Sequence, residues 1–70
     1  MTREEALPKI LVGGRYQHYK GGIYIVDFLA INAETNEPMV VYHSNESNET
    51  YTRPVERWLE NVNVPRFNYY

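Results

Sequence analysis

The chain has 70 residues, no cysteine and a formal net charge of −2, and 14% of its residues are aromatic. A chain of this length forms one small domain. The missing cysteines exclude a disulfide framework and a cysteine-ligated zinc site, and the acidic balance argues against tight binding to duplex DNA. No apolar run approaches the roughly 20 residues of a membrane span. Because the acidic start is unlike a signal peptide, we expect a soluble cytoplasmic protein.

The first twelve residues are predicted to form an extension with a short helical turn. Thr2 and Glu5 have the spacing of a capping box, and Pro8 is expected to end the helix. The domain itself is predicted over residues 13–68, beginning at the bend formed by Gly13 and Gly14. Residues 69–70 are expected to be a tail.

Five short strands are predicted along this domain. The clearest is 23–31, which is rich in β-branched and aromatic residues and apolar on both faces except at Asp27. Pro38 opens a strand that continues to His43 and is expected to pair with 23–31 as a hairpin. The remaining strands are expected at residues 15–19, 51–53 and 65–67, with Val62 and Val64 leading into the last one.

A short helix or 3₁₀ turn is predicted just before the last strand. Pro54 suits the first position of such a turn, and Val55, Trp58 and Leu59 have the spacing of one apolar helix face. Five short strands and one turn predict a mainly β fold, for which a small SH3-like barrel or roll is the nearest architecture. An open meander capped by the Trp58 turn is the alternative.

Several short motifs, taken in order, resemble the DUF1653 family, a small domain of unknown function with an SH3-like roll. The resemblance implies this fold over roughly residues 13–68, and it supplies no catalytic residue. Residues 45–49 are more acidic and richer in amides than the glycine-containing turn expected there. The residues that carry the resemblance are Gly14 to Tyr24, Glu34, Thr35, Val40, Val41, Tyr42, Arg53, Pro54, an aromatic at Trp58, and Val64, Pro65, Arg66 and Phe67.

The segment from His18 to Gly22 is the first candidate binding segment. Its two glycines let the backbone approach a ligand closely, and Lys20 could meet an anion. The alternative interpretation is a hairpin turn with a solvated lysine.

Arg53 and Arg66 are the second candidate, because each adjoins a proline at a predicted strand end. A guanidinium held in that way could clamp a carboxylate or a phosphate, or stack on a base. In the alternative interpretation, at least one of them pairs with Glu34, Asp27 or Glu56 and ties the ends of the barrel together.

The tyrosines are the third candidate, because their flat apolar rings and hydroxyl groups suit nucleobases and peptides. Those expected to converge on one rim from different strands are Tyr19, Tyr24, Tyr42 and Tyr51. A domain this small also needs large side chains in its core. The aromatic residues assigned to the core are Phe28, Trp58 and Phe67.

The sequence offers little for catalysis. It has no cysteine nucleophile, and His18 and His43 could share a metal only if adjacent strands brought them together. No third metal ligand is indicated by spacing. We therefore expect no catalytic residue, no metal and no cofactor.

These observations predict a non-enzymatic binding module that holds, and could sequester, a small anionic, nucleotide-derived ligand. We expect a homo-oligomer, because an interface deepens the shallow pockets of one small domain. The alternatives are a protein-interaction domain of the SH3-like type and a weak binder of single-stranded RNA; no membrane or duplex DNA partner is expected. The predicted ligand-binding residues are His18, Lys20, Tyr24, Tyr42, Tyr51, Arg53 and Arg66.

Overall fold

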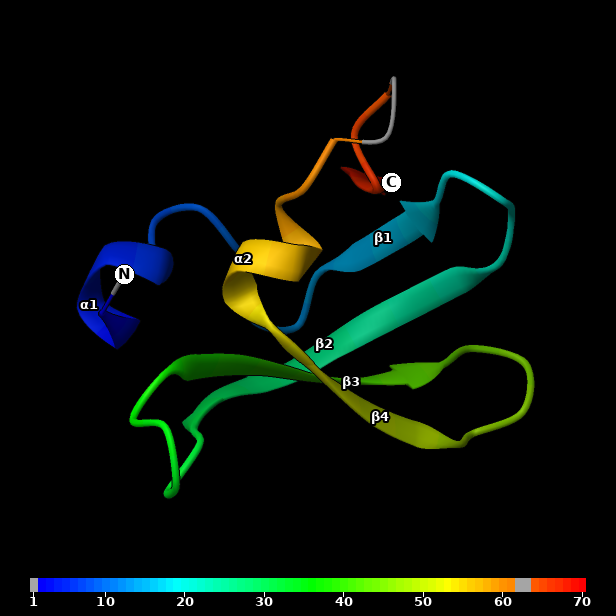
Figure 1. The fold of residues 1–70 in the computed structure, drawn as a ribbon. Coiled ribbons are helices and arrows are strands. Elements are labelled where there is room, and N and C mark those ends of the chain that lie inside the picture. The colour runs from blue at the N-terminus through cyan, green and yellow to red at the C-terminus, as the bar shows by residue number, and fades with distance from the viewer. Residues whose placement is uncertain (1, 62–63) are drawn as a thin grey trace.

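The computed structural model describes residues 2–61 and 64–70, and it is mainly β, as predicted. The five strands are all antiparallel and form one sheet in the order β4-β3-β2-β1-β5. Figure 1 shows how this sheet curls, with α2 following directly on β4 and lying beside the start of β1. The elements are α1 (Arg3–Ala6), β1 (Arg15–His18), β2 (Ile23–Ile31), β3 (Pro38–Ser44), β4 (Thr50–Pro54), α2 (Val55–Trp58) and β5 (Phe67–Tyr69).

The sheet is open, because β4 and β5 are its two edges within the described residues. Strands β1 to β4 follow one another as a meander, and β5 returns to pair with β1. This order and curl are compatible with the SH3-like roll expected from the sequence. No helix in the described part of the chain is long and apolar enough to span a membrane.

Helix α1 begins with the capping box that the sequence predicts. The Thr2 hydroxyl accepts a hydrogen bond from the Glu5 backbone N–H at 3.2 Å, and the Glu5 carboxylate accepts one from the Thr2 N–H at 2.7 Å. The helix ends at Ala6, two residues before Pro8. Ala6 and Ile10 are fully buried, so this extension is packed into the core of the domain.

A β-bulge in β2 reverses the expected position of Phe28. Val26 pairs with Tyr42 and Phe28 pairs with Val41, which leaves Asp27 as an extra residue between them. Since side chains alternate between the two faces of a strand, one extra residue moves Phe28 from the inner face to the outer face. Phe28 is 55% exposed, so its assignment to the core was wrong.

The exposure of Phe28 gives a direct test of this register. We expect Phe28→Thr to lower the free energy of unfolding by less than about 1 kcal/mol, because threonine favours strands and little buried surface is lost. Val26→Thr on the inner face is the control, and it should cost more because Val26 is fully buried. Urea unfolding of both variants would measure the difference, and a larger loss for Phe28→Thr would contradict the bulge.

The closing strand lies two residues later than predicted. Strand β5 starts at Phe67, and Tyr69, which was expected in the tail, pairs with Tyr16 of β1. Pro65 cannot donate a ladder hydrogen bond and instead forms an isolated bridge with Asn61. Val62, expected to lead into this strand, is outside the described residues.

The core lies between the inner face of the sheet and the two helices. Its centre is Trp58, whose indole stacks on the Phe67 ring with centroids 3.7 Å apart and planes 3° apart. The assignment of both residues to the core is therefore confirmed. The buried residues are Ala6, Ile10, Tyr16, Val26, Leu29, Val40, Tyr42, Val55, Trp58 and Phe67.

Candidate ligand-binding site

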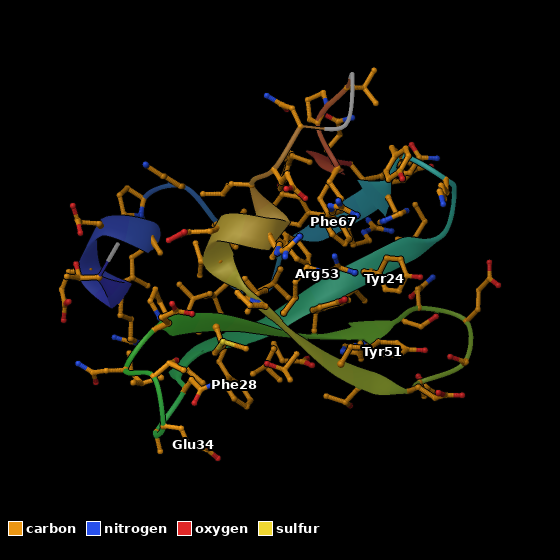
Figure 2. All side chains as sticks on the ribbon, in the orientation of Figure 1. Tyr24, Phe28, Glu34, Tyr51, Arg53 and Phe67 are labelled. Atoms are coloured by element: carbon orange, nitrogen blue, oxygen red, sulfur yellow. The ribbon has the colours of Figure 1, made fainter. Side chains whose placement is uncertain are left out.

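One cluster of aromatic and basic side chains gathers on the inner face of the sheet, beside the core. Strand register places them there, because Tyr42 lies opposite Tyr51 and His18 lies opposite Phe67. Figure 2 shows Tyr24, Arg53 and Phe67 on this side, whereas Phe28 lies on the other side. We call this cluster the aromatic–basic face; it comprises His18, Tyr19, Lys20, Tyr24, Tyr42, Tyr51, Arg53, Arg66 and Phe67.

Three tyrosines from three neighbouring strands contact one another on this face. The ring centroid of Tyr24 lies 5.5 Å from that of Tyr42 and 6.3 Å from that of Tyr51, and Tyr42 and Tyr51 are 5.6 Å apart. Tyr42 is 5% exposed and Tyr51 is 40% exposed. Tyr42 therefore belongs to the floor of the face, and Tyr51 offers its ring to solvent.

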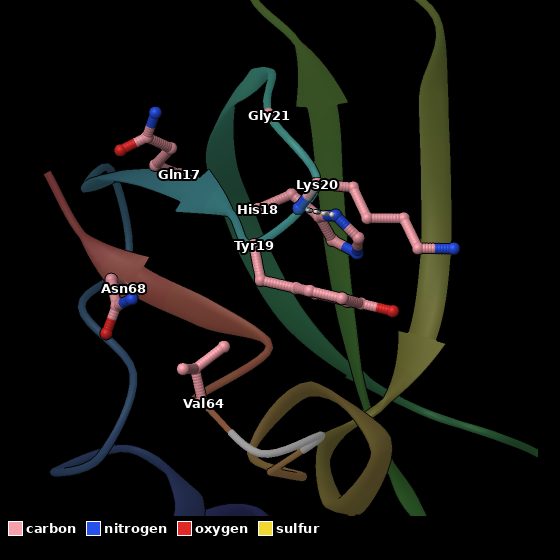
Figure 3. A pocket seen from close by; sticks show the side chains of 7 residues that line it. All are labelled: Gln17, His18, Tyr19, Lys20, Gly21, Val64 and Asn68. Atoms are coloured by element: carbon pink, nitrogen blue, oxygen red, sulfur yellow. Dashed lines mark hydrogen bonds between the residues drawn. The ribbon is translucent and has the colours of Figure 1, made fainter.

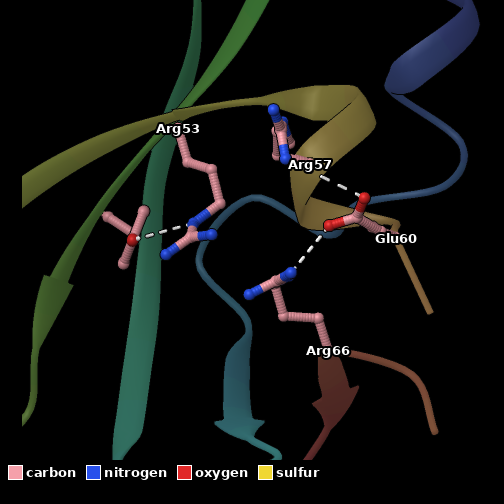
Figure 4. Close-up of polar contacts among 5 residues, drawn as sticks. Arg53, Arg57, Glu60 and Arg66 are labelled. Atoms are coloured by element: carbon pink, nitrogen blue, oxygen red, sulfur yellow. Dashed lines mark hydrogen bonds and ion pairs between the residues drawn. The ribbon is translucent and has the colours of Figure 1, made fainter. Parts of the chain in front are cut away.

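Arg53 lies over the aromatic floor without a carboxylate partner. Its guanidinium carbon is 5.5 Å from the Phe67 ring centroid, and its Nε donates a hydrogen bond to the Tyr42 hydroxyl at 3.3 Å (Figure 4). Among the described residues no carboxylate lies within ion-pair distance of it. Its two terminal NH₂ groups thus keep their donors for a ligand, and the ion-pair interpretation does not hold for Arg53.

Arg66 does form an ion pair, but with a carboxylate that the sequence did not indicate. Its Nη2 donates to the Glu60 carboxylate at 2.6 Å (Figure 4). The partners expected for an arginine at this position were Glu34, Asp27 and Glu56, and Asp27 instead pairs with His43 at 2.8 Å.

The side chain of Arg66 is 18% exposed, and its buried Nε has no hydrogen-bond partner among the described residues. Its guanidinium carbon lies 5.8 Å from the Tyr19 ring centroid. Arg66 therefore ties the segment after α2 to the β1–β2 turn, with only part of its charge left for a ligand.

His18 is the polar group at the centre of the face. Its ring centroid lies 4.9 Å from that of Phe67 and 4.7 Å from that of Tyr19. Its Nδ1 accepts a hydrogen bond from the backbone N–H of Lys20 at 3.2 Å (Figure 3). Burial, followed by the nearby charges of Arg53, Arg66 and Lys20, lowers the pKa of His18 below its ordinary value.

The three basic side chains of the face, Arg53, Arg66 and Lys20, all lie near His18. Lys20 places its ammonium 5.7 Å from the Tyr19 ring centroid, on the same side as His18. Tyr51 has an acidic neighbour, because its hydroxyl donates to the Glu49 carboxylate at 3.4 Å. Burial, followed by the Glu49 carboxylate, raises the pKa of Tyr51 above its ordinary value, so this hydroxyl stays protonated at neutral pH.

A hollow of about 480 Å³ adjoins the face at His18, Tyr19 and Lys20. His18 and Lys20 line it, so it opens next to the cluster, but Tyr24, Tyr51 and Arg53 lie outside it (Figure 3). The lining residues are Gln17, His18, Tyr19, Lys20, Gly21, Val64 and Asn68.

The two histidines do not share a site. His18 faces the inner side with Phe67, whereas His43 follows the inward-facing Tyr42 by one residue and binds Asp27 on the outer side. Within residues 2–61 and 64–70, no group of three or more histidine, cysteine or acidic side chains has the geometry of a metal site.

The structure brings six of the seven predicted residues into one continuous set of contacts, and Arg66 joins it through the Tyr19 ring. The prediction missed two partners. The Phe67 ring contacts both His18 and Arg53, although the sequence analysis assigned Phe67 only to the core. Glu60 binds Arg66 across the turn after α2, and no helix or strand spacing in the sequence predicts a contact between these two positions.

The fold and this face define a small antiparallel β domain with a positively charged aromatic surface. The chain belongs to the DUF1653 family, described as a protein of unknown function, whose model matches residues 14–69. A crystal structure of a DUF1653 protein from Bordetella bronchiseptica is similar to it, with 34% sequence identity, a TM-score of 0.77, and coverage of 89% of this chain and 90% of the other. No curated protein matches the chain.

Proposed function

We propose that this domain is a non-enzymatic binding module for a small anionic ligand with a flat aromatic part, such as a nucleotide. The observation that carries the proposal is the set of contacts made by Arg53. Its guanidinium carbon lies 5.5 Å from the Phe67 ring centroid, its Nε donates a hydrogen bond to the Tyr42 hydroxyl, and no carboxylate among the described residues neutralises it. A fixed guanidinium with free terminal donors suits an oxyanion, because little side-chain entropy is lost on binding.

The charges of the face favour an anion over a cation. Aromatic cages can also hold ammonium groups, because the ring faces are electron-rich. Here Arg53 already lies over the Phe67 ring, and Lys20 and Arg66 lie over the Tyr19 ring. A cationic ligand would be repelled by these three side chains, whereas an anion is attracted.

The tyrosines supply the surface for the flat part of the ligand. The exposed ring of Tyr51 contacts Tyr24, so the two present adjoining apolar surfaces on the face. The Glu49 carboxylate beside the Tyr51 hydroxyl disfavours a second negative charge there. The ligand is therefore expected to place its charged group near Arg53 and its ring near Tyr51.

The test compares adenosine monophosphate (AMP) with adenosine and with inorganic phosphate by isothermal titration calorimetry. AMP should bind more tightly than either fragment, because it contacts both Arg53 and the tyrosine rings. Arg53→Gln should weaken AMP binding by about tenfold or more, the usual effect of removing a charge-assisted hydrogen bond.

Arg15→Gln is the matched control, because it removes the same charge from an exposed position next to the inward-facing Tyr16. It should leave AMP binding unchanged. Equal binding of AMP and adenosine, or equal effects of the two arginine variants, would contradict the proposal.

The same variants separate this proposal from the two alternatives. A peptide held by the tyrosines would not need Arg53, and a single-stranded RNA would lose affinity steeply as salt is raised. The homo-oligomer and the cytoplasmic location stay predictions, and native mass spectrometry of the purified protein would report the number of subunits.

A further inference from the structure

We propose that His18 donates a hydrogen bond to the anionic group of the ligand, with its Nε2–H directed between Arg53 and Lys20. This inference rests on the proposed function, since it names a residue that contacts the ligand in the same site. It goes beyond charge attraction, because it assigns one neutral donor and one tautomer to the site.

The tautomer follows from the hydrogen bond at Nδ1. The donor at that position is the backbone N–H of Lys20, which can only donate, at 3.2 Å. Nδ1 must therefore accept, and in a neutral imidazole the single proton then belongs to Nε2. Figure 3 shows the ring joined to the Lys20 backbone by this hydrogen bond, on the same side as the Tyr19 hydroxyl and the Lys20 chain.

The position of the ring brings this donor to the anion. His18 packs edge-on against Phe67, and Arg53 lies over that same ring. Lys20 is held next to His18 through its own backbone. An oxyanion at the terminal NH₂ groups of Arg53 would then meet three donors of different kinds, from Arg53, His18 and Lys20.

Burial of the His18 ring, followed by the positive charges that face it, lowers its pKa and so favours the neutral form when the site is empty. Tyr19 and Lys20 lie on the β1–β2 turn, Tyr24 on β2 and Arg53 on β4, and Arg66 precedes β5 with its charge partly balanced by Glu60. All the full charges among them are positive except that of Glu60. Without a ligand they oppose a further positive charge on the ring.

A bound anion reverses this balance. A negative charge beside the ring favours protonated His18, so the pKa of His18 is higher in the complex than in the free protein. Binding then takes up a proton when the pH lies between these two pKa values. Affinity therefore increases as the pH falls through this range, by up to about tenfold for each unit of pKa difference.

The probe must not change its own charge with pH. The 5′-sulfate ester of adenosine fulfils this condition and has the shape of AMP, whose phosphate titrates near neutral pH. Its affinity for the wild-type protein is expected to rise several-fold between about pH 7.5 and about pH 5.5.

Two substitutions at His18 separate the donor from the titration. His18→Gln keeps an N–H donor that does not titrate, so it should bind the probe at about pH 7.5 but lose the pH dependence. His18→Phe keeps a ring against Phe67 without a donor. It should bind about tenfold more weakly than the wild type at about pH 7.5, and the difference should be larger at about pH 5.5, because this variant cannot take up the proton. His43→Gln removes the other histidine, which faces the outer side, and should behave as the wild type.

The outcomes distinguish this inference from the proposed function. If neither AMP nor the sulfate ester binds, the proposed function fails and this inference fails with it. If AMP binds and depends on Arg53, but His18→Gln keeps the wild-type pH dependence, only the inference is overturned.

A measurement without ligand tests the starting state directly. Long-range ¹H–¹⁵N correlation spectra should show the Nε2–H tautomer of His18, with a pKa below the ordinary value of about 6.5. Arg53→Gln should raise that pKa, because one of the facing positive charges is gone. The Nδ1–H tautomer would overturn the proposal.

Discussion

Trp58→Ala is expected to lower the free energy of unfolding by about 3–5 kcal/mol. Trp58 is 2% exposed, stacks on Phe67, and meets the edges of Tyr16 and Tyr42 at centroid distances of 5.4 and 4.9 Å. A domain of this size is stabilised by roughly 4–10 kcal/mol in total. The variant should therefore be largely unfolded, or close to it, at ambient temperature.

Urea unfolding followed by circular dichroism would measure this loss, because the variant has no tryptophan left for fluorescence. Leu59→Ala is the matched control in the next position, since Leu59 is 37% exposed and should cost clearly less. Trp58→Phe, which keeps a ring against Phe67, should also lose less than Trp58→Ala. A loss below about 1 kcal/mol for Trp58→Ala would mean that this stack is not the centre of the core.

Gly22→Ala should damage both the fold and the candidate site. Gly22 has φ +90°, a conformation that costs an L-residue with a side chain about 1–2 kcal/mol. An added Cβ would also lie 3.3 Å from the Tyr24 ring, which cannot move freely because it contacts Tyr42 and Phe67. The variant is therefore expected to be less stable and to bind AMP more weakly.

Gly21→Ala separates these two effects. Gly21 has φ +102°, and an added Cβ would meet no atom within 4 Å. Its loss of stability should come from backbone strain alone, with AMP binding unchanged once the protein is folded. If both variants lose the same stability and bind AMP equally, the contact between position 22 and Tyr24 has no effect on the site.

Local patterns were sufficient to predict most elements of this fold. The run from Ile23 to Ile31 gave strand β2 with its observed bounds, and Thr2 with Glu5 gave the cap of α1. Helix α2 was also predicted, because Pro54 suits the start of a helical turn. These features depend on residues within a few positions of one another, so their physical causes are contained in the sequence.

The candidate site depends on contacts between residues that are far apart in the sequence. The sequence supplied the residue types of the site, and the tyrosines and Arg53 were singled out from it. Whether Arg53 pairs with a carboxylate is decided by strand register, which places it opposite Val40 and near Phe67. Arg66 meets Glu60 only because the chain turns back after α2.

The sequence by itself determined the class of fold, the positions of the strands within a few residues, and the chemistry available for binding. Only the tertiary structure decided which side chains share a face. The bulge at Asp27 shows the physical reason. One extra residue in β2 moves Phe28 from the inner face to the outer face, while Tyr24 and Val26, which precede the bulge, stay on the inner face. That exchange comes from pairing with β3, so it cannot be read from the alternation in β2 alone.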